Sequence, residues 1–121
     1  MLDMLCKVGL SYIKFGQSAA TLSGGETQRI KLAKELCDGK TKGAIYILDE
    51  PTSGLSSADS ENVMDLLHEL TVRGKLVITV IHQPSSDIFK GFDKVLILDM
   101  MGHLVFYGNP LDAVVHFKTL E

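Results

Sequence analysis

The sequence predicts an α/β fold whose core is a parallel β–α–β unit. Two short apolar runs, 44–48 and 76–81, each end abruptly in polar residues. Such runs are typical of strands in a parallel sheet, which is buried on both faces. Between them lies a stretch with the i, i+3, i+4, i+7 spacing of an amphipathic helix, formed by Val63, Leu66, Leu67 and Leu70. A strand, a helix and a strand of these lengths predict a right-handed crossover between parallel strands.

The N-terminal part of the chain is expected to be helical. Apolar residues at helical spacing predict a short helix that opens the chain and stops near Gly9, followed by a turn over 10–20. A second helix is expected to start in 21–26, because Ser23 and Glu26 have the spacing of a capping box. The predicted inner face of this helix consists of Ile30, Ala33 and Cys37. Gly39 is its predicted stop, within a polar loop over 38–43.

Turn and cap residues delimit the remaining elements. Pro51 cannot donate a hydrogen bond to a sheet and closes the first strand. Ser56 and Asp59 predict the start of the crossover helix, which ends at 73–74. The runs 95–98 and 104–107 predict a β-hairpin. Asn109, followed by proline, predicts the cap of a last helix that extends to residue 120.

Size and composition predict one soluble domain. With 121 residues and a net charge of −3, the chain has no concentrated basic patch for nucleic acid. Cys6 and Cys37 lie far apart, which argues against a zinc module and for a reducing compartment. No apolar run is long enough to span a bilayer and no signal peptide is visible, so a cytoplasmic location is expected.

The first candidate site is the run Leu22-Ser23-Gly24-Gly25-Glu26. It can be read simply as a well-capped helix start. It can also be read as an anion site, since two glycines let a ligand approach the backbone and the free N–H groups favour a phosphate. The string by itself leaves both interpretations open.

The second candidate site is formed by acidic residues and a histidine that follow the two predicted strands. Asp49 and Glu50 follow the first strand, and His82 follows the second. Each could be a polar strand end without a function. The carboxyl edge of parallel strands is, however, where α/β sheets bind ligands. There, one carboxylate can hold Mg²⁺ while the other orients an attacking water.

The order and spacing of these motifs resemble those of the ATP-binding-cassette (ABC) ATPases, over nearly the whole chain. The run 22–26 resembles the signature motif of that family. The strand 45–49 resembles its Walker B strand, with Glu50 in the place of the catalytic carboxylate. The run 53–55 resembles the start of the D-loop, and His82 resembles the switch histidine.

The resemblance implies a partial P-loop NTPase fold, with a helical signature region (1–43) and a partial ATPase core (44–121). It also implies a head-to-tail dimer that encloses ATP, with Mg²⁺ bound by Asp49. Glu50 and His82 would be catalytic, polarising the attacking water and contacting the γ-phosphate, respectively. The nucleotide-binding residues implied by the resemblance are Ser23, Gly24, Gly25, Glu26, Ser53 and Gly54.

Two subfamilies are visible. Residues 1–52 resemble excinuclease A subunits, the damage-recognising ATPases of bacterial nucleotide excision repair, through 9–17 and 21–36. Residues 49–121 resemble the ATPase domains of G-type (white-like) exporters, through runs such as 81–89. We therefore hypothesise a mosaic chain, natural or engineered, joined near the first strand. A single close relative that spans the join would remove this hypothesis.

Two departures from the family pattern matter. Ser56 stands where transporters have Asp after Ser-Gly-Leu, and no Gly-x-x-x-x-Gly-Lys-Ser/Thr run (Walker A) is present. Such a loop provides most of the grip on the phosphates, so a Walker A-containing segment or subunit is the expected partner. Without its neighbouring strand, 76–81 would form an apolar edge, which predicts self-association into a homo-oligomer.

Three functions remain open at this stage. The leading one is an ATPase fragment derived from an excinuclease A subunit, with DNA and the other excinuclease subunits as partners. The second is the ATPase subunit of a G-type transporter, which would meet a membrane permease domain at the inner face of the membrane. The third is a non-catalytic interaction or dimerisation module.

Overall fold

The computed structural model describes residues 2–14, 16–38 and 43–120. The chain forms two compact units, Met1–His82 and Gln83–Glu121. The first unit contains both the predicted signature region, 1–43, and the first strands of the predicted core.

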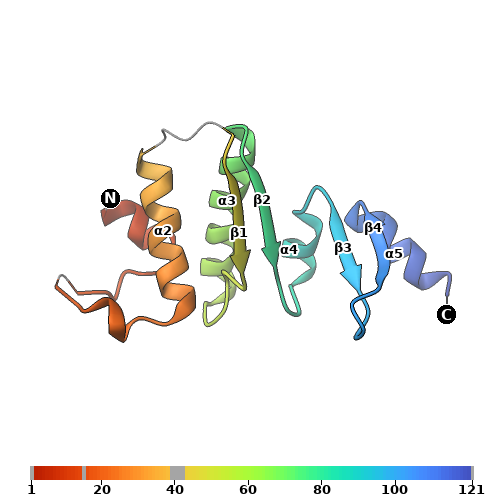
Figure 1. Cartoon of the computed structure of the whole chain (residues 1–121), viewed down its shortest axis with the longest axis horizontal. Helices are drawn as coiled ribbons and strands as arrows, with labels where there is room; N and C mark the ends of the chain where they lie inside the picture. Colours follow the sequence, from red (N-terminus) through yellow and green to blue (C-terminus); the bar gives the residue numbers. More distant parts are fainter. Residues whose placement is uncertain (1, 15, 39–42, 121) are drawn as a thin grey trace. The chain divides into compact units, whose positions relative to one another are not determined.

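The first unit is a parallel β–α–β unit preceded by helices. Its elements are α1 (Leu2–Lys7), the 3₁₀ helix η1 (Ala19–Thr21), α2 (Gly24–Asp38), β1 (Ile45–Asp49), α3 (Ser57–Val72) and β2 (Leu76–Val80), as Figure 1 shows. β1 and β2 are parallel, with Ile45 opposite Leu76 and Asp49 opposite Val80. The predicted parallel β–α–β unit is therefore confirmed, and both strands present their carboxyl ends at one edge.

Helix α3 supplies one side of the core through the predicted apolar stripe. Val63, Leu66, Leu67 and Leu70 are all buried. Residues of α2, of β1 and of the segment just after α1 complete the core, which includes Val8, Leu10, Leu32, Ala33, Leu36 and Leu48. The Ser56 hydroxyl accepts a hydrogen bond from the Asp59 N–H, so the predicted cap of α3 is also confirmed.

The end of α1 is fixed by a glycine, as the sequence predicts. Gly9 has φ +73°, a conformation that glycine adopts without a steric penalty. A Cβ at this position would lie 2.8 Å from Leu55 Cδ2. Gly9 therefore both turns the chain and lets it approach the loop after β1.

The predicted inner face of α2 is wrong by about one residue. Cys37 is exposed and Ile30 is half-buried, although Ala33 is fully buried as expected. The buried residues of α2 are Arg29, Leu32, Ala33 and Leu36. The first position of the buried stripe is thus a charged residue. A search for apolar residues alone does not find that position. The predicted stop at Gly39 lies outside the described residues.

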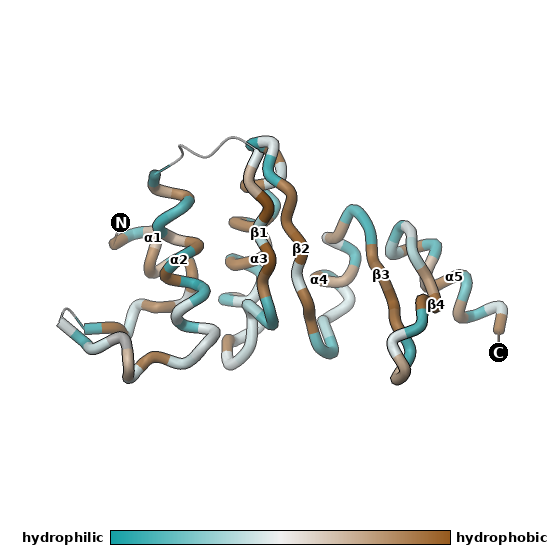
Figure 2. Tube along the Cα trace, viewed as in Figure 1, coloured by the Kyte–Doolittle hydropathy of each residue, from teal (hydrophilic) through white to brown (hydrophobic). Residues whose placement is uncertain are grey.

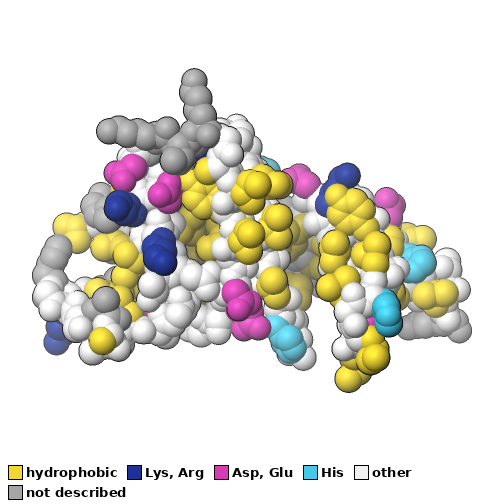
Figure 3. Space-filling view, in the orientation of Figure 1, with side chains coloured by type: hydrophobic (Ala, Val, Ile, Leu, Met, Phe, Trp, Pro, Cys, Tyr) yellow, Lys and Arg dark blue, Asp and Glu magenta, His cyan; other side chains and the backbone are white. Residues whose placement is uncertain are grey.

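The expectation that the strands are buried on both faces is also wrong. Ile47 is 76% exposed and Ile78 is 48% exposed, and their neighbours Ile45, Leu76 and Val80 lie on the same open face. Figure 2 shows both strands as hydrophobic segments, and Figure 3 shows apolar side chains gathered over them. Within the described residues this face is uncovered, because the crossover helix covers only the opposite one.

The second unit is a hairpin flanked by helices. It consists of α4 (Ser86–Lys90), β3 (Val95–Leu98), β4 (Leu104–Gly108) and α5 (Pro110–Lys118). β3 and β4 pair antiparallel, and the Asn109 side chain accepts a hydrogen bond from the Leu111 N–H, so the predicted hairpin and cap are confirmed. In the part of the chain that the structure describes, no helix has the length and apolar character needed to cross a bilayer.

The open face of β1 and β2 makes a testable prediction about association. We expect the chain to self-associate with increasing concentration, and Ile78→Lys to suppress this, because lysine on a strand blocks edge pairing and apolar contact. Static light scattering over a concentration series measures it. Val72→Lys, a change of the same kind at a 74%-exposed residue of α3, is the control. A wild-type chain that stays monomeric at high concentration contradicts the prediction.

Candidate functional site

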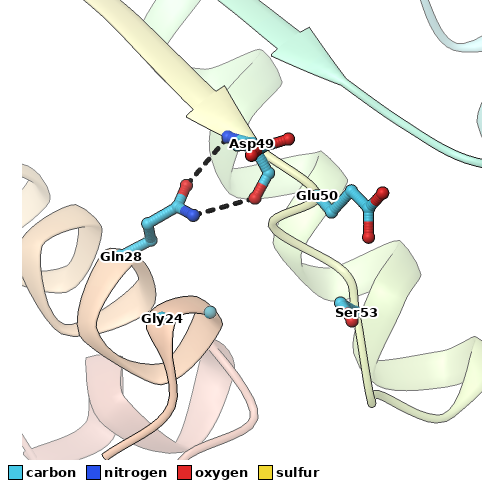
Figure 4. Close-up of a pocket in the computed structure, with 6 residues that line it drawn as sticks. Gly24, Gln28, Asp49, Glu50 and Ser53 are labelled. Carbon is cyan, nitrogen blue, oxygen red and sulfur yellow. Dashed lines mark hydrogen bonds between the residues drawn. The ribbon is translucent and has the colours of Figure 1, made fainter.

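A surface pocket of about 340 Å³ lies where the N-terminus of α2 meets the end of β1. It is lined by Gly24, Gly25, Gln28, Asp49, Glu50 and Ser53. Figure 4 shows how two segments far apart in the sequence form it, with the first turn of α2 on one side and the loop after β1 on the other. The pocket therefore brings free helix N–H groups close to two carboxylates.

The N-terminus of α2 is held by a reciprocal capping box. The Ser23 N–H donates to Glu26 Oε2 at 2.8 Å, and the Glu26 N–H donates to Ser23 Oγ at 3.3 Å. These bonds leave the N–H groups of Gly24 and Gly25 without partners in the described part of the chain. A Cβ on Gly24 would meet nothing within 4 Å. The helix end thus offers an anion open space beside two unpaired donors.

Tyr12 supports this cap from outside the helix. Its hydroxyl donates a hydrogen bond to Glu26 Oε1. This bond, followed by the one from the Ser23 N–H, holds the pKa of the Glu26 carboxyl below its ordinary value of 4.5. The same bond to Glu26 raises the pKa of the Tyr12 hydroxyl above 10.0. Glu26 is therefore an ionised structural cap at neutral pH, with its carboxylate oxygens engaged by donors.

Gln28 joins α2 to the end of β1. Its Nε2 donates to the main-chain oxygen of Asp49 at 2.8 Å, and its Oε1 accepts from the Asp49 N–H at 3.0 Å, as Figure 4 shows. The amide side chain thus pairs with β1 as a neighbouring strand would. Both main-chain groups of the residue that carries the first carboxylate are fixed by one side chain.

Arg29 joins α2 to the loop after β1. The side chain is only 3% exposed, and its Nη1 donates to the main-chain oxygens of Pro51 at 3.1 Å and Ser53 at 3.3 Å. Its Nε is buried without a hydrogen-bond partner. Burying a guanidinium costs free energy unless its N–H groups are hydrogen-bonded, so core packing alone does not explain an arginine at this position.

Glu50 has an unusual backbone conformation. Its φ of +47° lies in the left-handed region, which is sparsely populated by residues other than glycine. Its N–H donates to the Val80 oxygen at 2.8 Å, and its own oxygen accepts from the Ser53 N–H at 3.0 Å. Gln83, just beyond the end of β2, has the same φ of +47°. Such outliers often mark functional sites.

The structure brings together some of the predicted site residues. Gly24, Gly25, Asp49, Glu50 and Ser53 line one pocket. Ser23, Glu26, Gly54 and His82 do not line it; the first two cap α2 instead. His82 is exposed just beyond β2. Its role as a γ-phosphate contact stays a prediction.

No role was predicted from the sequence for Gln28 or Arg29, which follow the two glycines. Arg29 carried a usable signal, because it precedes Leu32, Ala33 and Leu36 at the spacing of one helix face. A charged residue at the first position of an apolar stripe must be held by specific partners. Gln28 carried no comparable signal, since its two bonds depend on how α2 docks against β1.

Three curated relatives align with nearly the full length of this chain. The chain is 47% identical over 118 residues to the UvrABC system protein A of Brucella abortus biovar 1 (strain 9-941), with 93% of this chain covered. It is 48% identical over 122 residues to that of Mesorhizobium japonicum, and 48% identical over 114 residues to that of Pseudomonas putida. These alignments cover 97% and 90% of this chain, respectively. No family model matches the chain.

A solved structure agrees with these relatives. The fold is similar to UvrA2 from Deinococcus radiodurans, with a TM-score of 0.80 and 32% sequence identity over 91% of this chain. The chain spans 12% of the length of each of the three curated relatives and 14% of the solved one. The similarity therefore concerns one segment of a much larger protein.

The comparisons do not support the mosaic hypothesis. Single relatives run across the proposed join near β1, and their alignments cover nine-tenths or more of this chain. The likeness of 49–121 to G-type exporters is likewise unsupported. Short runs such as 81–89 were therefore too local to assign a subfamily.

The Tyr12–Glu26 bond makes a prediction about pH. Folding lowers the pKa of Glu26, so its stabilising contribution is present above 4.5 and is lost as the pH falls through the folded-state pKa. We expect Tyr12→Phe to raise that pKa, to reduce stability at neutral pH and to flatten the loss of stability between about pH 5 and pH 3. Carboxyl titration by NMR and urea unfolding measure both effects.

The matched control for this test is Tyr107→Phe, because Tyr107 and Tyr12 are both 59% exposed. It removes a hydroxyl from the second unit and should leave the titration of Glu26 unchanged. A Glu26 pKa that is the same in Tyr12→Phe and in the wild type would show that the hydroxyl does not set it.

Proposed function

We propose that this chain is the part of an excinuclease A-type ABC ATPase that supplies the signature helix and the Walker B carboxylates to composite ATP sites. The pocket that joins Gly24 and Gly25 to Asp49 and Glu50 carries this proposal. The similarity to UvrABC system protein A over 93% of the chain supports it. The partial P-loop NTPase architecture belongs to the same proposal.

The N-terminus of α2 is suited to bind phosphate. Its unpaired N–H groups at Gly24 and Gly25 point out of the capped helix end, where the helix dipole adds partial positive charge. Gly24 leaves room for the phosphate oxygens, since no atom lies within 4 Å of where its Cβ would be. In the ABC arrangement this end would contact the γ-phosphate of a nucleotide held by the opposite subunit.

Asp49 fits the role of the Mg²⁺ ligand. It ends β1, is exposed and lines the pocket, with its main chain held by Gln28. Among the described residues, no three His, Cys, Asp or Glu side chains gather into a metal site. Mg²⁺ usually keeps several waters and takes one or two carboxylates plus substrate phosphates. When bound, the ion would neutralise phosphate charge.

Glu50 is the proposed catalytic carboxylate. It is exposed at the pocket, and Figure 4 shows its carboxylate extending away from Gln28. A carboxylate so placed can accept a proton from, or orient, a water that attacks the γ-phosphate. His82, at the same edge two residues beyond β2, is proposed to contact that phosphate. Both are catalytic residues in this proposal.

The site is proposed to be composite. The chain's residues include no Walker A run, so the main grip on the phosphates would come from another segment or subunit. The whole protein would then act on DNA with the other excinuclease subunits, in the cytoplasm. A non-catalytic module is the rival proposal, favoured only by the open apolar face of β1 and β2. Calorimetric titration of the chain with ATP, with and without Mg²⁺, separates the two.

The role of Glu50 can be tested by reconstituting the composite site. We expect hydrolysis when the chain is mixed with the Walker A segment of a UvrABC system protein A relative. Glu50→Gln should then lower kcat about 100-fold or more, the range for loss of a general base. Glu61→Gln, at an exposed residue of α3, is the control and should keep full activity. Equal turnover in Glu50→Gln and the wild type would show that the acid is misassigned.

The phosphate site at α2 can be tested by adding charge. Gly24→Asp should fold normally, because its Cβ meets open space, and should weaken Mg²⁺–ATP binding in the same mixture. Two unit charges about 4 Å apart repel by about 1 kcal/mol in water, so we expect Kd to rise at least about fivefold. Gly24→Asn has the same shape without the charge. Equal affinities of the two variants in calorimetry would exclude a phosphate at this helix end.

A further inference from the structure

We infer that Gln28 and Arg29 are positioning residues that hold the main chain around Glu50 in place against α2. This inference rests on the proposed function, because it concerns the proposed catalytic residue. It assigns to the second turn of α2 a task that neither the capping box nor core packing requires.

The hydrogen bonds around Glu50 show how completely this segment is held. Gln28 takes both main-chain groups of the residue before Glu50, at 2.8 and 3.0 Å. Arg29 donates hydrogen bonds to the main-chain oxygens of Pro51 and Ser53, which follow Glu50 in the chain. The N–H and oxygen of Glu50 itself bond to Val80 and Ser53. Two adjacent side chains of one helix therefore fix the chain on both sides of the proposed catalytic residue.

This restraint explains how Glu50 keeps its backbone conformation. A glutamate at φ +47° is unfavourable and persists only where the surrounding structure over-determines it. In an isolated loop the residue would relax to a negative φ, and its carboxylate would move. The bonds from Gln28 and Arg29, with those of Glu50 itself to Val80 and Ser53, provide the restraint, so they fix the backbone position from which the side chain extends.

Gly25 is part of the same arrangement. A Cβ on this residue would lie 3.1 Å from Arg29 Nη1 and 4.0 Å from the Ser53 oxygen. The second glycine of the run thus leaves the space through which Arg29 reaches the loop after β1. Gly25 therefore contributes a backbone donor to the pocket and also leaves space for the Arg29 side chain, which holds the loop around Glu50.

Packing alone does not account for Arg29. It begins the buried stripe that continues with Leu32, Ala33 and Leu36, where an apolar side chain would avoid burying a charge. One of its nitrogens, Nε, stays without a hydrogen-bond partner. The guanidinium also lies near Tyr12 and Glu26, but its two bonds to main-chain oxygens beside Glu50 are what connect it to the loop after β1.

Arg29→Met tests this because it separates positioning from stability. Methionine fits the apolar stripe, so the urea midpoint should stay the same or rise. Both bonds to the loop are lost, so Glu50 should leave its left-handed conformation. The strong amide–Hα NOE within Glu50, which a positive φ produces, should then weaken in NMR spectra of the ligand-free chain. A residue with only a structural role would lower stability and leave that signal in place.

Gln28 gives an independent test through hydrogen exchange. In Gln28→Ala the Asp49 amide loses its acceptor and should exchange about fivefold faster, as expected for one net hydrogen bond. Gln28→Glu keeps a carboxylate acceptor for that amide and should keep most of the protection. Lys31→Ala, at an exposed position of the same helix, is the control and should change neither exchange nor the Glu50 NOE.

Hydrolysis in the reconstituted mixture provides the functional readout. Gln28→Ala and Arg29→Met should lower kcat about 10- to 100-fold, as for a displaced catalytic group, with the KM for ATP changed less than about twofold. The NMR signals need no nucleotide, so they test the inference even if the mixture never hydrolyses ATP. Absence of hydrolysis in the wild-type mixture counts against the proposed function alone. An unchanged Glu50 NOE in Gln28→Ala and in folded Arg29→Met would overturn the inference alone.

Discussion

The docking of α2 against the carboxyl end of β1 is the contact on which the rest of the site depends. Gln28 pairs with the main chain of Asp49, and Arg29 reaches the oxygens of Pro51 and Ser53. Main-chain hydrogen bonds have strict geometry, so they fix orientation as well as distance. Because both side chains come from one turn of helix, the unpaired donors at its start and the carboxylates after β1 form one rigid group. The two sets of groups therefore keep a fixed relation to each other.

This arrangement concentrates unfavourable features in a small region. The segment contains a buried guanidinium with an unpaired nitrogen and a glutamate in the left-handed region, close to one another. Each feature is unfavourable alone. The Arg29 side chain restrains the loop that contains Glu50, and main-chain oxygens of that loop accept hydrogen bonds from the Arg29 guanidinium. The remainder of the first unit is conventional, with the α3 stripe and the residues of α1, α2 and β1 forming an apolar core. The ordinary core offsets the cost of the site, and local departures from folding rules are expected at functional positions.

The parts of the fold with local signals were predictable. Capping residues and apolar periodicity fixed α3 and the crossover, and the hairpin and α5 followed from turn residues. The glycines, Asp49, Glu50 and Ser53 were found as motifs, and the structure places them in one pocket. What failed depends on contacts between distant segments. The face of α2 was displaced because Arg29 is charged, and its main-chain partners lie more than twenty residues away. The burial of β1 was overestimated because an apolar run shows what a strand can bury and not what covers it.

The open face of β1 and β2 and the absent phosphate grip have a common physical meaning. The apolar side chains on this face are all about half or more exposed: Ile45, Ile47, Leu76, Ile78 and Val80. β1 ends at Asp49, opposite the end of β2, which lies two residues before His82. A parallel sheet is stable when both faces are covered, so whatever covers this face lies directly beside the pocket. α2 fixes the carboxylates from one side only, and the opposite side stays available to a segment that brings the phosphates. Under the proposed function, the chain would orient the attacking groups by itself, while affinity for the nucleotide would depend on the covering segment. Such a separation of orientation from affinity would make hydrolysis conditional on assembly, which is the behaviour that a composite site requires.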